Sequence, residues 1–337
     1  MTDIKSLNLT ELTDYIISLG EKAFRARQIF EWLHTKHVSD FDDMTNLSLV
    51  LREKLKKSAY ISGMKIMTEL ISKEDGTRKY LLELDDGNII ESVLMRYEYG
   101  LSICISSQVG CRMGCRFCAS TIDGLVRNLT AAEMLDEIHI VQEHIGERIS
   151  HVVIMGSGEP LDNYDNFIRF VGLTDISHRN ITVSTCGIAP RIYDLADTHN
   201  QVTLALSLHA PEDELRKSIM PVANAYSVTE LMEACSYFFE KTGRRLTFEY
   251  SLISGVNDSE ECAHKLAELA KPLGAHINLI PVNPVEERDF RQPYIKTINA
   301  FKSKLERCGI NATIRREMGR DISGACGQLR RHYKDIK

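Results

Sequence analysis

The sequence Cys111-Arg-Met-Gly-Cys115-Arg-Phe-Cys118 places three cysteines within eight residues, at the spacing C-x3-C-x2-C. Thiolates gathered this densely are typical ligands of a soft metal ion or an iron–sulfur cluster. A closed zinc site needs four ligands, and the chain has no second C-x2-C pair to complete one. Three cysteines that hold four irons leave one iron open, where a substrate or cofactor can bind directly. The spacing therefore predicts a four-iron cluster, with a zinc or electron-transfer site as the alternative.

Strands and helices alternate along the chain around and after this motif. Six predicted strands form successive strand–helix units, and two of the helices begin with capping boxes, Thr130 with Glu133 and Ser227 with Glu230. This succession indicates a parallel sheet with right-handed crossovers. We expect an α/β fold built on a partial (β/α)6 barrel, and a doubly wound open sheet is the alternative. The predicted strands are 101–106, 151–155, 181–185, 202–207, 246–253 and 276–281.

The first hundred residues have a different character. Hydrophobic residues at helical spacing predict helices within 9–35 and over 47–57, and residues 80–84 and 89–94 flank a turn at 85–88. The chain thus divides into four expected parts. They are a small helical accessory domain at 1–65, a connecting β-hairpin at 66–100, the barrel at 101–315 and a C-terminal segment at 316–337.

Polar or conformationally special residues follow the predicted parallel strands where the strands end. The segment Gly156-Ser-Gly-Glu-Pro160 follows the second strand, and Ser207-Leu-His209 ends the fourth. Ligands bind at the carboxyl ends of parallel strands in both candidate architectures. Loops are also polar for purely structural reasons, so each of these residues has a structural interpretation as well. Their agreement with the cysteine motif favours a ligand site at this edge of the sheet.

The composition indicates an ordinary globular protein. Hydrophobic residues make up 43% and charged residues 26% of the 337 residues, which excludes a disordered chain and a coiled-coil rod. No apolar run approaches the roughly 18 residues of a membrane span, and the N-terminus does not resemble a signal peptide. Nine cysteines without an export signal fit a reducing compartment. We expect a cytoplasmic protein without membrane contact, and the net charge of −6 alone would favour a small substrate.

The cysteine motif, placed after the first barrel strand, resembles that of the radical S-adenosylmethionine (SAM) superfamily. The segment Gly158-Glu159-Pro160 after the second strand is similar to a glycine-rich segment of the same superfamily. The resemblance implies a [4Fe-4S] cluster held by the three motif cysteines, with SAM bound to the open iron. One electron from the cluster would then cleave SAM and release a 5′-deoxyadenosyl radical.

Further motifs narrow the resemblance to the dual-specificity adenine C2 methyltransferases of 23S ribosomal RNA and tRNA (RlmN-type). The Cfr-type enzymes, which methylate C8 of the same rRNA adenine, are the nearest alternative. Pro160 and the segment 24–33 favour C2, whereas Ser157 departs from the methionine that is common in the family. The motifs are Phe24-Arg-Ala-Arg-Gln-Ile-Phe-Glu-Trp-Leu33, Met44-Thr-Asn-Leu-Ser48, Cys104-Ile-Ser-Ser-Gln-Val-Gly-Cys111 and Gly324-Ala-Cys326-Gly-Gln-Leu329.

The resemblance implies radical chemistry, because adenine C2 is too electron-poor to attack the methyl group of SAM. Cys326 would first be methylated by one SAM, and a radical from a second SAM would turn that methyl group into a methylene radical that adds to C2. Cys104 would release the product by forming a disulfide with Cys326. Glu91 would accept the C2 proton, and Cys104 is the alternative acceptor for that step. Seven further residues would surround SAM: Gly158, Glu159, Ser184, Ser207, Leu208, His209 and Asn283.

Some of these residues have structural interpretations when the resemblance is set aside. Cys104 alternates with Ile103 and Ile105 on a strand, which is typical of a core cysteine, and Glu91 would be a solvent-facing carboxylate. A radical SAM enzyme with a small-molecule or protein substrate is an alternative, but it has no evident need for Cys104 with Cys326. A non-enzymatic iron–sulfur carrier is another, but it has no need for SAM contacts.

The implied partners are 23S rRNA, tRNA and a one-electron reductant such as flavodoxin, and nothing in the sequence requires more than a monomer. RNA is bound mainly through its phosphates. The stretch 315–337 carries seven basic and three acidic residues and is the candidate contact, although a solvated charged face is the plain alternative. Basic residues elsewhere would extend it, namely Lys54, Lys56, Lys57, Arg112, Arg116 and Arg127.

Overall fold

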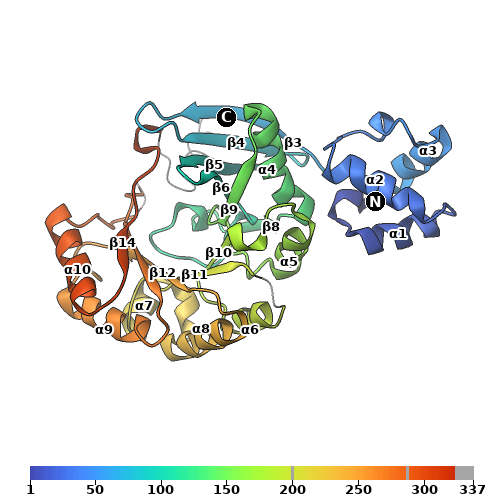
Figure 1. The fold of residues 1–337 in the computed structure, drawn as a ribbon. Helices are drawn as coiled ribbons and strands as arrows, with labels where there is room; N and C mark the ends of the chain where they lie inside the picture. Colours follow the sequence, from blue (N-terminus) through green and yellow to red (C-terminus); the bar gives the residue numbers. More distant parts are fainter. Residues whose placement is uncertain (199–200, 286–287, 323–337) are drawn as a thin grey trace.

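One long sheet dominates the fold. The computed structural model describes residues 1–198, 201–285 and 288–322, and within them ten strands form a sheet in the order β14-β13-β12-β11-β10-β9-β6-β5-β4-β3 (Figure 1). From β6 to β14 the strands lie beside one another in chain order, with no reversal. A doubly wound sheet reverses at a switch point. The order therefore identifies a partial barrel, open between β14 and β3, and excludes the doubly wound alternative.

Within the described residues, seven strands of this sheet run parallel. All six predicted strands are among them, each within two residues of its expected bounds. The seventh, β14, has only three residues, too few for a sequence pattern to reveal it. The parallel strands are β6 (Gly100–Ile105), β9 (Ile149–Ile154), β10 (Ile181–Thr185), β11 (Thr203–Ser207), β12 (Thr247–Leu252), β13 (His276–Pro281) and β14 (Ala312–Ile314).

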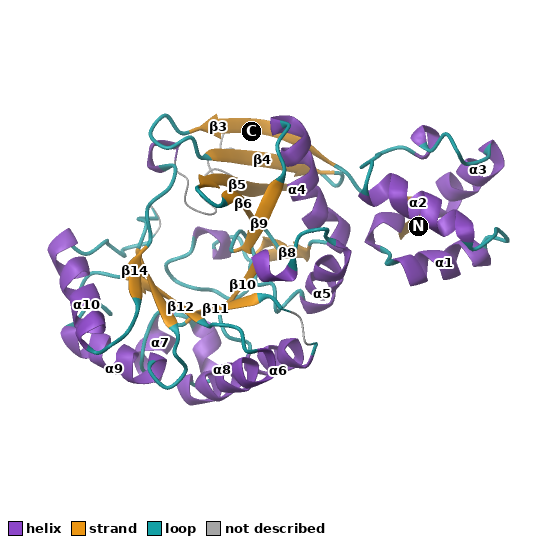
Figure 2. Cartoon of the chain, viewed as in Figure 1, coloured by secondary structure: helices purple, strands orange, loops and turns teal. Residues whose placement is uncertain are grey.

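Helices cover the outer face of the curved sheet (Figure 2). Strand and helix side chains meet in a continuous core, to which Phe167, Phe238 and Phe248 contribute fully buried rings. Both predicted capping boxes are formed, at the starts of α4 and α8. The helices of this part are α4 (Ala131–Ile145), α5 (Tyr164–Leu173), α6 (Ala189–Asp197), α7 (Asp213–Ile219), α8 (Val228–Thr242), α9 (Glu260–Ala270) and α10 (Ile295–Arg307).

Three antiparallel strands extend the sheet beyond β6. β4 (Arg78–Leu84) and β5 (Ile89–Tyr97) form the predicted hairpin, and their turn occupies residues 85–88 as expected. β5 pairs antiparallel with β6, so the hairpin continues the sheet of the barrel, and β3 (Met64–Ile71) forms its outer edge. A separate ribbon of β7 (Gln108–Gly110) and β8 (Leu125–Asn128) brackets the cysteine motif.

The N-terminal region is a small helical unit beside the barrel (Figure 1). It contains α1 (Leu9–Ser18), α2 (Phe24–His34) and α3 (Leu49–Ser58), and it has a hydrophobic core of its own, which runs from Ile4 to Ala59. Among the described residues, no helix of the protein is long and apolar enough to cross a bilayer. The remaining short elements are β1 (Thr2–Asp3), β2 (Ala59–Tyr60), η1 (Ile4–Ser6), η2 (Phe41–Asp43), η3 (Ala119–Thr121), η4 (His178–Asn180), η5 (Pro221–Asn224) and η6 (Arg320–Ile322).

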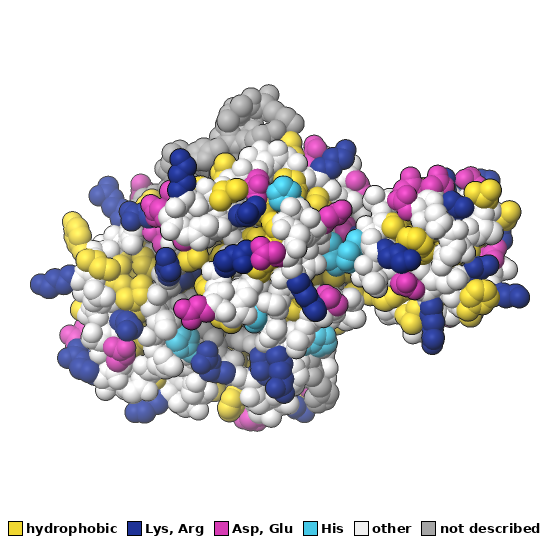
Figure 3. Space-filling view, turned by 45° about the horizontal axis from the view of Figure 1, so that its top comes forward, with side chains coloured by type: hydrophobic (Ala, Val, Ile, Leu, Met, Phe, Trp, Pro, Cys, Tyr) yellow, Lys and Arg dark blue, Asp and Glu magenta, His cyan; other side chains and the backbone are white. Residues whose placement is uncertain are grey.

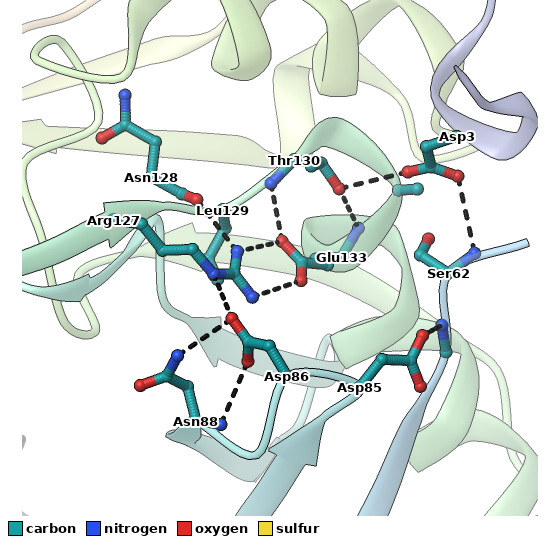
Figure 4. A network of polar contacts seen from close by, with 12 residues as sticks. Asp3, Ser62, Asp85, Asp86, Asn88, Arg127, Asn128, Leu129, Thr130 and Glu133 are labelled. Carbon is teal, nitrogen blue, oxygen red and sulfur yellow. Dashed lines mark hydrogen bonds and ion pairs between the residues drawn. The ribbon is translucent and has the colours of Figure 1, made fainter. Parts of the chain in front are cut away.

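Polar contacts join the helical unit to the barrel, as Figure 4 shows. The Asp3 carboxylate accepts hydrogen bonds from the Ser62 amide and from the Thr130 hydroxyl at the start of α4. Lys5 forms an ion pair with Asp136 of α4, and both side chains are buried. The first residues of the chain therefore fix the helical unit against the helix that follows the cysteine motif.

Candidate active site

The loop that carries the cysteine motif is held by the backbone of the β7–β8 ribbon. The Cys111 amide donates a hydrogen bond to the Gly124 carbonyl at 3.0 Å. Gly110, at φ +79°, brings the two chains so close that a Cβ there would lie 2.0 Å from the Gly124 oxygen. Farther along the loop, the Thr121 hydroxyl donates to the Cys115 carbonyl at 3.0 Å. These contacts within the protein fix the course of the loop.

The three motif cysteines line one cavity of about 250 Å³ at the carboxyl ends of the parallel strands. Cys111 is 6% exposed and Cys115 8% exposed. Burial raises the pKa of Cys111 to about 12 and also raises the pKa of Cys118. Thiolates therefore form here only when a bound metal displaces the protons.

The donor set fits an iron–sulfur cluster better than a zinc ion. Throughout the described part of the chain, no three histidine, cysteine or carboxylate side chains converge as a single metal ion would require. A cluster binds each thiolate to a different iron, so its cysteines stand around a shared space instead of a single point. Cys111, Cys115 and Cys118 would hold the cluster here. When bound, such a cluster supplies single electrons.

Six of the seven expected SAM-contact residues line this same cavity. The hydroxyls of Ser184 and Ser207 are 3.3 Å apart, at the ends of the neighbouring strands β10 and β11. Leu208 is the exception, because it is fully buried and does not line the cavity; its carbonyl accepts a hydrogen bond from Arg216. The six lining residues are Gly158, Glu159, Ser184, Ser207, His209 and Asn283.

Glu159 is buried at the cavity wall, in the loop after β9. Its carboxylate accepts hydrogen bonds from the amides of Cys186 at 2.7 Å and Leu161 at 3.0 Å, and burial raises its pKa. A carboxylate has further lone pairs, so these two bonds leave room for a donor from a ligand such as an ammonium group. Before it, Gly158 has φ +104°, and a Cβ there would lie 2.5 Å from the Gln108 side chain.

His209 stands at the end of β11 with φ +56°, an uncommon conformation outside glycine. Its Nδ1 accepts a hydrogen bond from the Ser251 amide at 2.9 Å, which assigns the ring proton to Nε2. Burial lowers the pKa of His209 to about 3, so the ring is neutral near pH 7. Phe117 of the cysteine motif contacts the ring edge to face, with centroids 4.9 Å apart. The imidazole can thus act as a fixed neutral donor.

A second cavity of about 210 Å³ adjoins the first. The wall between them comes from the loop after β9, the end of β13 and the residue that follows β14. Cys104 and Glu91, the other two predicted reactive residues of the described chain, line this second cavity. The residues that line both cavities are Met155, Gly156, Ile280, Asn283 and Arg315.

Cys104 and Glu91 are held on neighbouring antiparallel strands. Cys104 lies directly opposite Val93 in the β5–β6 register, and burial raises its pKa to about 11. Glu91 is only 5% exposed, so the interpretation of a solvent-facing carboxylate is wrong. It forms an ion pair with Lys79 at 3.1 Å, and the Lys79 side chain is fully buried. Sequence reasoning missed this lysine.

The predicted methyl carrier, Cys326, lies outside the described residues. The segment 315–318 lines the second cavity together with Cys104, and Cys326 follows Met318 by eight residues. The eight described cysteines have free thiols. The predicted disulfide between Cys104 and Cys326 therefore stays a prediction.

Several basic residues that we expected to extend the RNA contact are occupied by carboxylates. Arg112 pairs with Asp162, and Lys54 pairs with Glu21. Arg127 makes two ion pairs, with Asp86 in the hairpin turn and with Glu133 of α4. In Figure 3, basic and acidic side chains are interspersed over the face that is shown. These pairs reduce the charge that the three residues can offer to a phosphate.

Comparisons with known proteins agree with this arrangement. The family model "Ribosomal RNA large subunit methyltransferase N-terminal domain" matches residues 2–61, and the radical SAM superfamily model matches 105–267. A probable dual-specificity RNA methyltransferase RlmN of Lachnospira eligens is 59% identical, over 99% of this chain and 97% of the relative. Another from Clostridium perfringens is 55% identical, over 99% and 98%.

A solved structure of a related protein has the same fold. The crystal structure of a radical SAM methyltransferase from Sphaerobacter thermophilus matches with a TM-score of 0.90 and 41% identity, over 97% of this chain and 99% of that one. Family membership implies a [4Fe-4S] cluster and SAM as cofactors, which is the donor chemistry that the three-cysteine cavity fits. The chain belongs to the RlmN family of dual-specificity RNA methyltransferases, within the radical SAM superfamily.

Proposed function

We propose that the protein methylates C2 of an adenosine in 23S rRNA and of an anticodon-loop adenosine in tRNAs, using two SAM molecules per turnover. The observation that carries the proposal is the common wall of the two cavities. The first cavity holds the cysteine motif and the SAM-contact residues, and the second holds Cys104 and Glu91. A reactive species made in one can reach a target in the other without crossing bulk water.

Each cavity has its own residue roles in this proposal. In the first, Cys111, Cys115 and Cys118 bind the cluster. The strand-end residues orient SAM, to which Glu159 offers a carboxylate. In the second, Glu91 takes the proton from C2 and Cys104 resolves the covalent intermediate. The target base has to leave its stack to enter a cavity of this kind.

Cys326 completes the proposal as the carrier of the methyl group. Its support is the course of the chain: Arg315 to Met318 line the second cavity, and Cys326 follows Met318 by only eight positions. An extended chain covers up to about 3.6 Å per residue, so the chain after Met318 is long enough for Cys326 to reach the cavity that Cys104 lines. The basic composition of the stretch 315–337 also suits an RNA substrate.

The proposal extends to the parts of the chain and their partners. The helical unit, residues 1–65, would hold the shape of the RNA beside the barrel of residues 101–315. The hairpin at 66–100 would connect them, and the segment 316–337 would deliver Cys326. The protein would act as a monomer in the cytoplasm, with a one-electron donor such as flavodoxin.

The test is an anaerobic assay with nucleoside mass spectrometry. The reconstituted protein receives SAM, a reductant and an unmethylated 23S rRNA fragment or tRNA, and the RNA is then digested. We expect 2-methyladenosine. A product of 8-methyladenosine would overturn the assignment of C2, and release of 5′-deoxyadenosine without a methylated base would overturn the RNA substrate.

Replacement of the carrier tests the mechanism separately. Cys326→Ala should abolish the product and leave the absorption of the iron–sulfur cluster unchanged. Cys308→Ala, which alters a partly buried cysteine at the end of α10, should retain both and serves as the matched control. Loss of the cluster in Cys326→Ala would contradict the carrier role.

A further inference from the structure

Arg216 is a buried cation without an acidic hydrogen-bond partner. It lies on α7 and is 0% exposed. Its Nε donates to the Leu208 carbonyl at 3.1 Å, and its Nη2 donates to the Cys186 carbonyl at 2.5 Å and, more weakly, to the Ser207 carbonyl at 3.5 Å. Its Nη1 has no hydrogen-bond partner within the described residues. The guanidinium therefore keeps its full charge in the interior while bonded only to neutral groups.

This arrangement differs from that of the other buried cations. Among the described residues, three cationic side chains are buried, namely Lys5, Lys79 and Arg216. Lys5 pairs with Asp136 and Lys79 pairs with Glu91, whereas Arg216 has no ion pair with any residue that the structure describes. Removal of a charge from water costs several kcal/mol, and only an opposite charge or a dense set of hydrogen bonds offsets that cost. The carbonyls offset part of it, and one arm of the guanidinium remains unbonded.

The helix that carries Arg216 lies against the cysteine motif. The end of α7 contacts the motif loop directly, because the Arg116 amide donates to the Ile219 carbonyl at 2.9 Å. Two of the carbonyls that Arg216 bonds belong to Cys186 and Ser207, which line the same cavity as the three motif cysteines. Arg216 is therefore close enough for its charge to act on the site that the cluster would occupy.

We propose that Arg216 is the built-in countercharge of the iron–sulfur cluster and raises its reduction potential. Reduction adds one electron, taken from an external one-electron reductant, and neither forms nor breaks a bond. A fixed cation in a dry interior stabilises the more negative, reduced form more than the oxidised form. The inference rests on the cluster that family membership implies, and it is independent of which adenine carbon is methylated.

The direct test is an anaerobic redox titration followed by electron paramagnetic resonance, without RNA. Arg216→Gln removes the charge and keeps one hydrogen-bond donor group. At the potential where half of the wild-type cluster is reduced, the reduced-to-oxidised ratio of the variant should fall at least tenfold. For a one-electron couple this corresponds to a shift of about 59 mV towards more negative potential.

Two further variants distinguish an effect of the Arg216 charge from a purely structural role of the side chain. Arg216→Lys keeps the charge and should recover most of the wild-type midpoint. Lys217→Gln removes the neighbouring charge on the same helix, where the side chain is exposed and pairs with Glu214, so water screens it and the midpoint should not move. If Arg216 only fastens the strand-end carbonyls, Arg216→Gln will lose stability with an unchanged midpoint. That result would overturn the proposal.

If Arg216→Gln does not bind enough cluster for a redox titration, cluster loading is measured instead. Iron content and urea unfolding of the metal-free proteins are then compared. Loading by Arg216→Lys but not by Arg216→Gln, with both metal-free proteins folded, would support the countercharge. Failure of both folded variants to load would overturn it, because charge alone would not suffice. A failed methylation assay with a normal midpoint shift would refute the proposed RNA activity and leave this inference intact.

Discussion

Gly158 stands where the loop after β9 passes the start of β7, next to Glu159, which is a predicted SAM contact. Its φ of +104° lies in a region that side chains rarely adopt. A Cβ there would also lie 2.5 Å from the Cβ of Gln108 and 2.7 Å from its amide nitrogen. A glycine at the edge of a ligand cavity lets a ligand approach the backbone closely. The structure shows that Gly158 also lets two loops of the protein itself come together.

Gly158→Ala should lower the free energy of unfolding by about 2–4 kcal/mol, since backbone strain and overpacking add at this position. Urea unfolding of the metal-free protein measures the change. Gly243→Ala is the matched control: its φ is +62°, and no atom lies within 4 Å of its added Cβ, so only the strain of about 1 kcal/mol remains. Equal losses in the two variants would show that the close contact with Gln108 is relaxed at little cost.

At the scale of single residues, the sequence predicted those whose spacing or position after a strand is informative. The three cysteines and the strand-end residues belong to this class, and all but Leu208 line the predicted site. The sequence did not predict roles for Lys79 and Arg216, because their partners are determined by tertiary contacts. Lys79 reaches Glu91 across the β4–β5 register, and nothing in a single sequence fixes that register. Arg216 has the appearance of an ordinary polar position on a short helix.

Two helices of the barrel begin with the same capping box in different surroundings. In α8, Glu230 caps an exposed helix start. In α4, the Glu133 carboxylate is buried, accepts from the Thr130 amide at 2.8 Å and forms a two-pronged pair with Arg127 (Figure 4). Arg127 in turn pairs with Asp86 in the hairpin turn. One local motif thus joins a helix, the β7–β8 ribbon and the hairpin.

Glu133→Ala should therefore destabilise the protein by about 3 kcal/mol, because it removes a cap and leaves Arg127 with a single carboxylate partner. Glu230→Ala removes the same motif from an exposed helix and should cost distinctly less. Thermal or urea unfolding of both variants checks the difference. If the two losses were alike, the contacts of Arg127 would contribute nothing beyond the helix cap.

Elements were predictable where their pattern is regular and long enough. The six main barrel strands and the hairpin were found, whereas β3 and β14 were not. β14 has only three residues, too few to show the alternation of apolar and polar residues that marks a strand. β3 contains an irregularity between Ile66 and Thr68 that shifts its pairing with β4, and this breaks the alternation of apolar residues on which a strand prediction depends.

At the scale of the whole molecule, two hydrophobic cores are joined through polar contacts. The helical unit has its own core, and the barrel has another. Lys5 and Asp136, which lie 131 positions apart in the chain, form a buried pair between them. The sequence predicts both bodies from local patterns. It cannot predict how they dock, because no local pattern connects residues so far apart.

The docking pair leads to a prediction about pH. Lys5→Met leaves the Asp136 carboxyl buried beside no cation, and the loss at pH 7 should be about 3 kcal/mol. Burial already raises the pKa of Asp136, which Lys5 counteracts, so the variant raises it further. A carboxyl whose folded pKa is raised stabilises the fold fully at low pH and loses that contribution as the pH rises. The deficit of Lys5→Met should therefore be small near pH 5 and grow towards pH 8.

The double variant Lys5→Met/Asp136→Leu decides what the pair does. Two apolar side chains of similar size leave no buried charge, so the double variant should unfold within about 1 kcal/mol of the wild type, with the extra pH dependence gone. Arg96→Met breaks the exposed pair with Glu147 and serves as the control for loss of a cation as such. If the double variant were as unstable as the single one, the two bodies would depend on the ion pair itself for docking. Recovery would instead show that the apolar fit between η1 and α4 suffices and that the charges are costly only when separated.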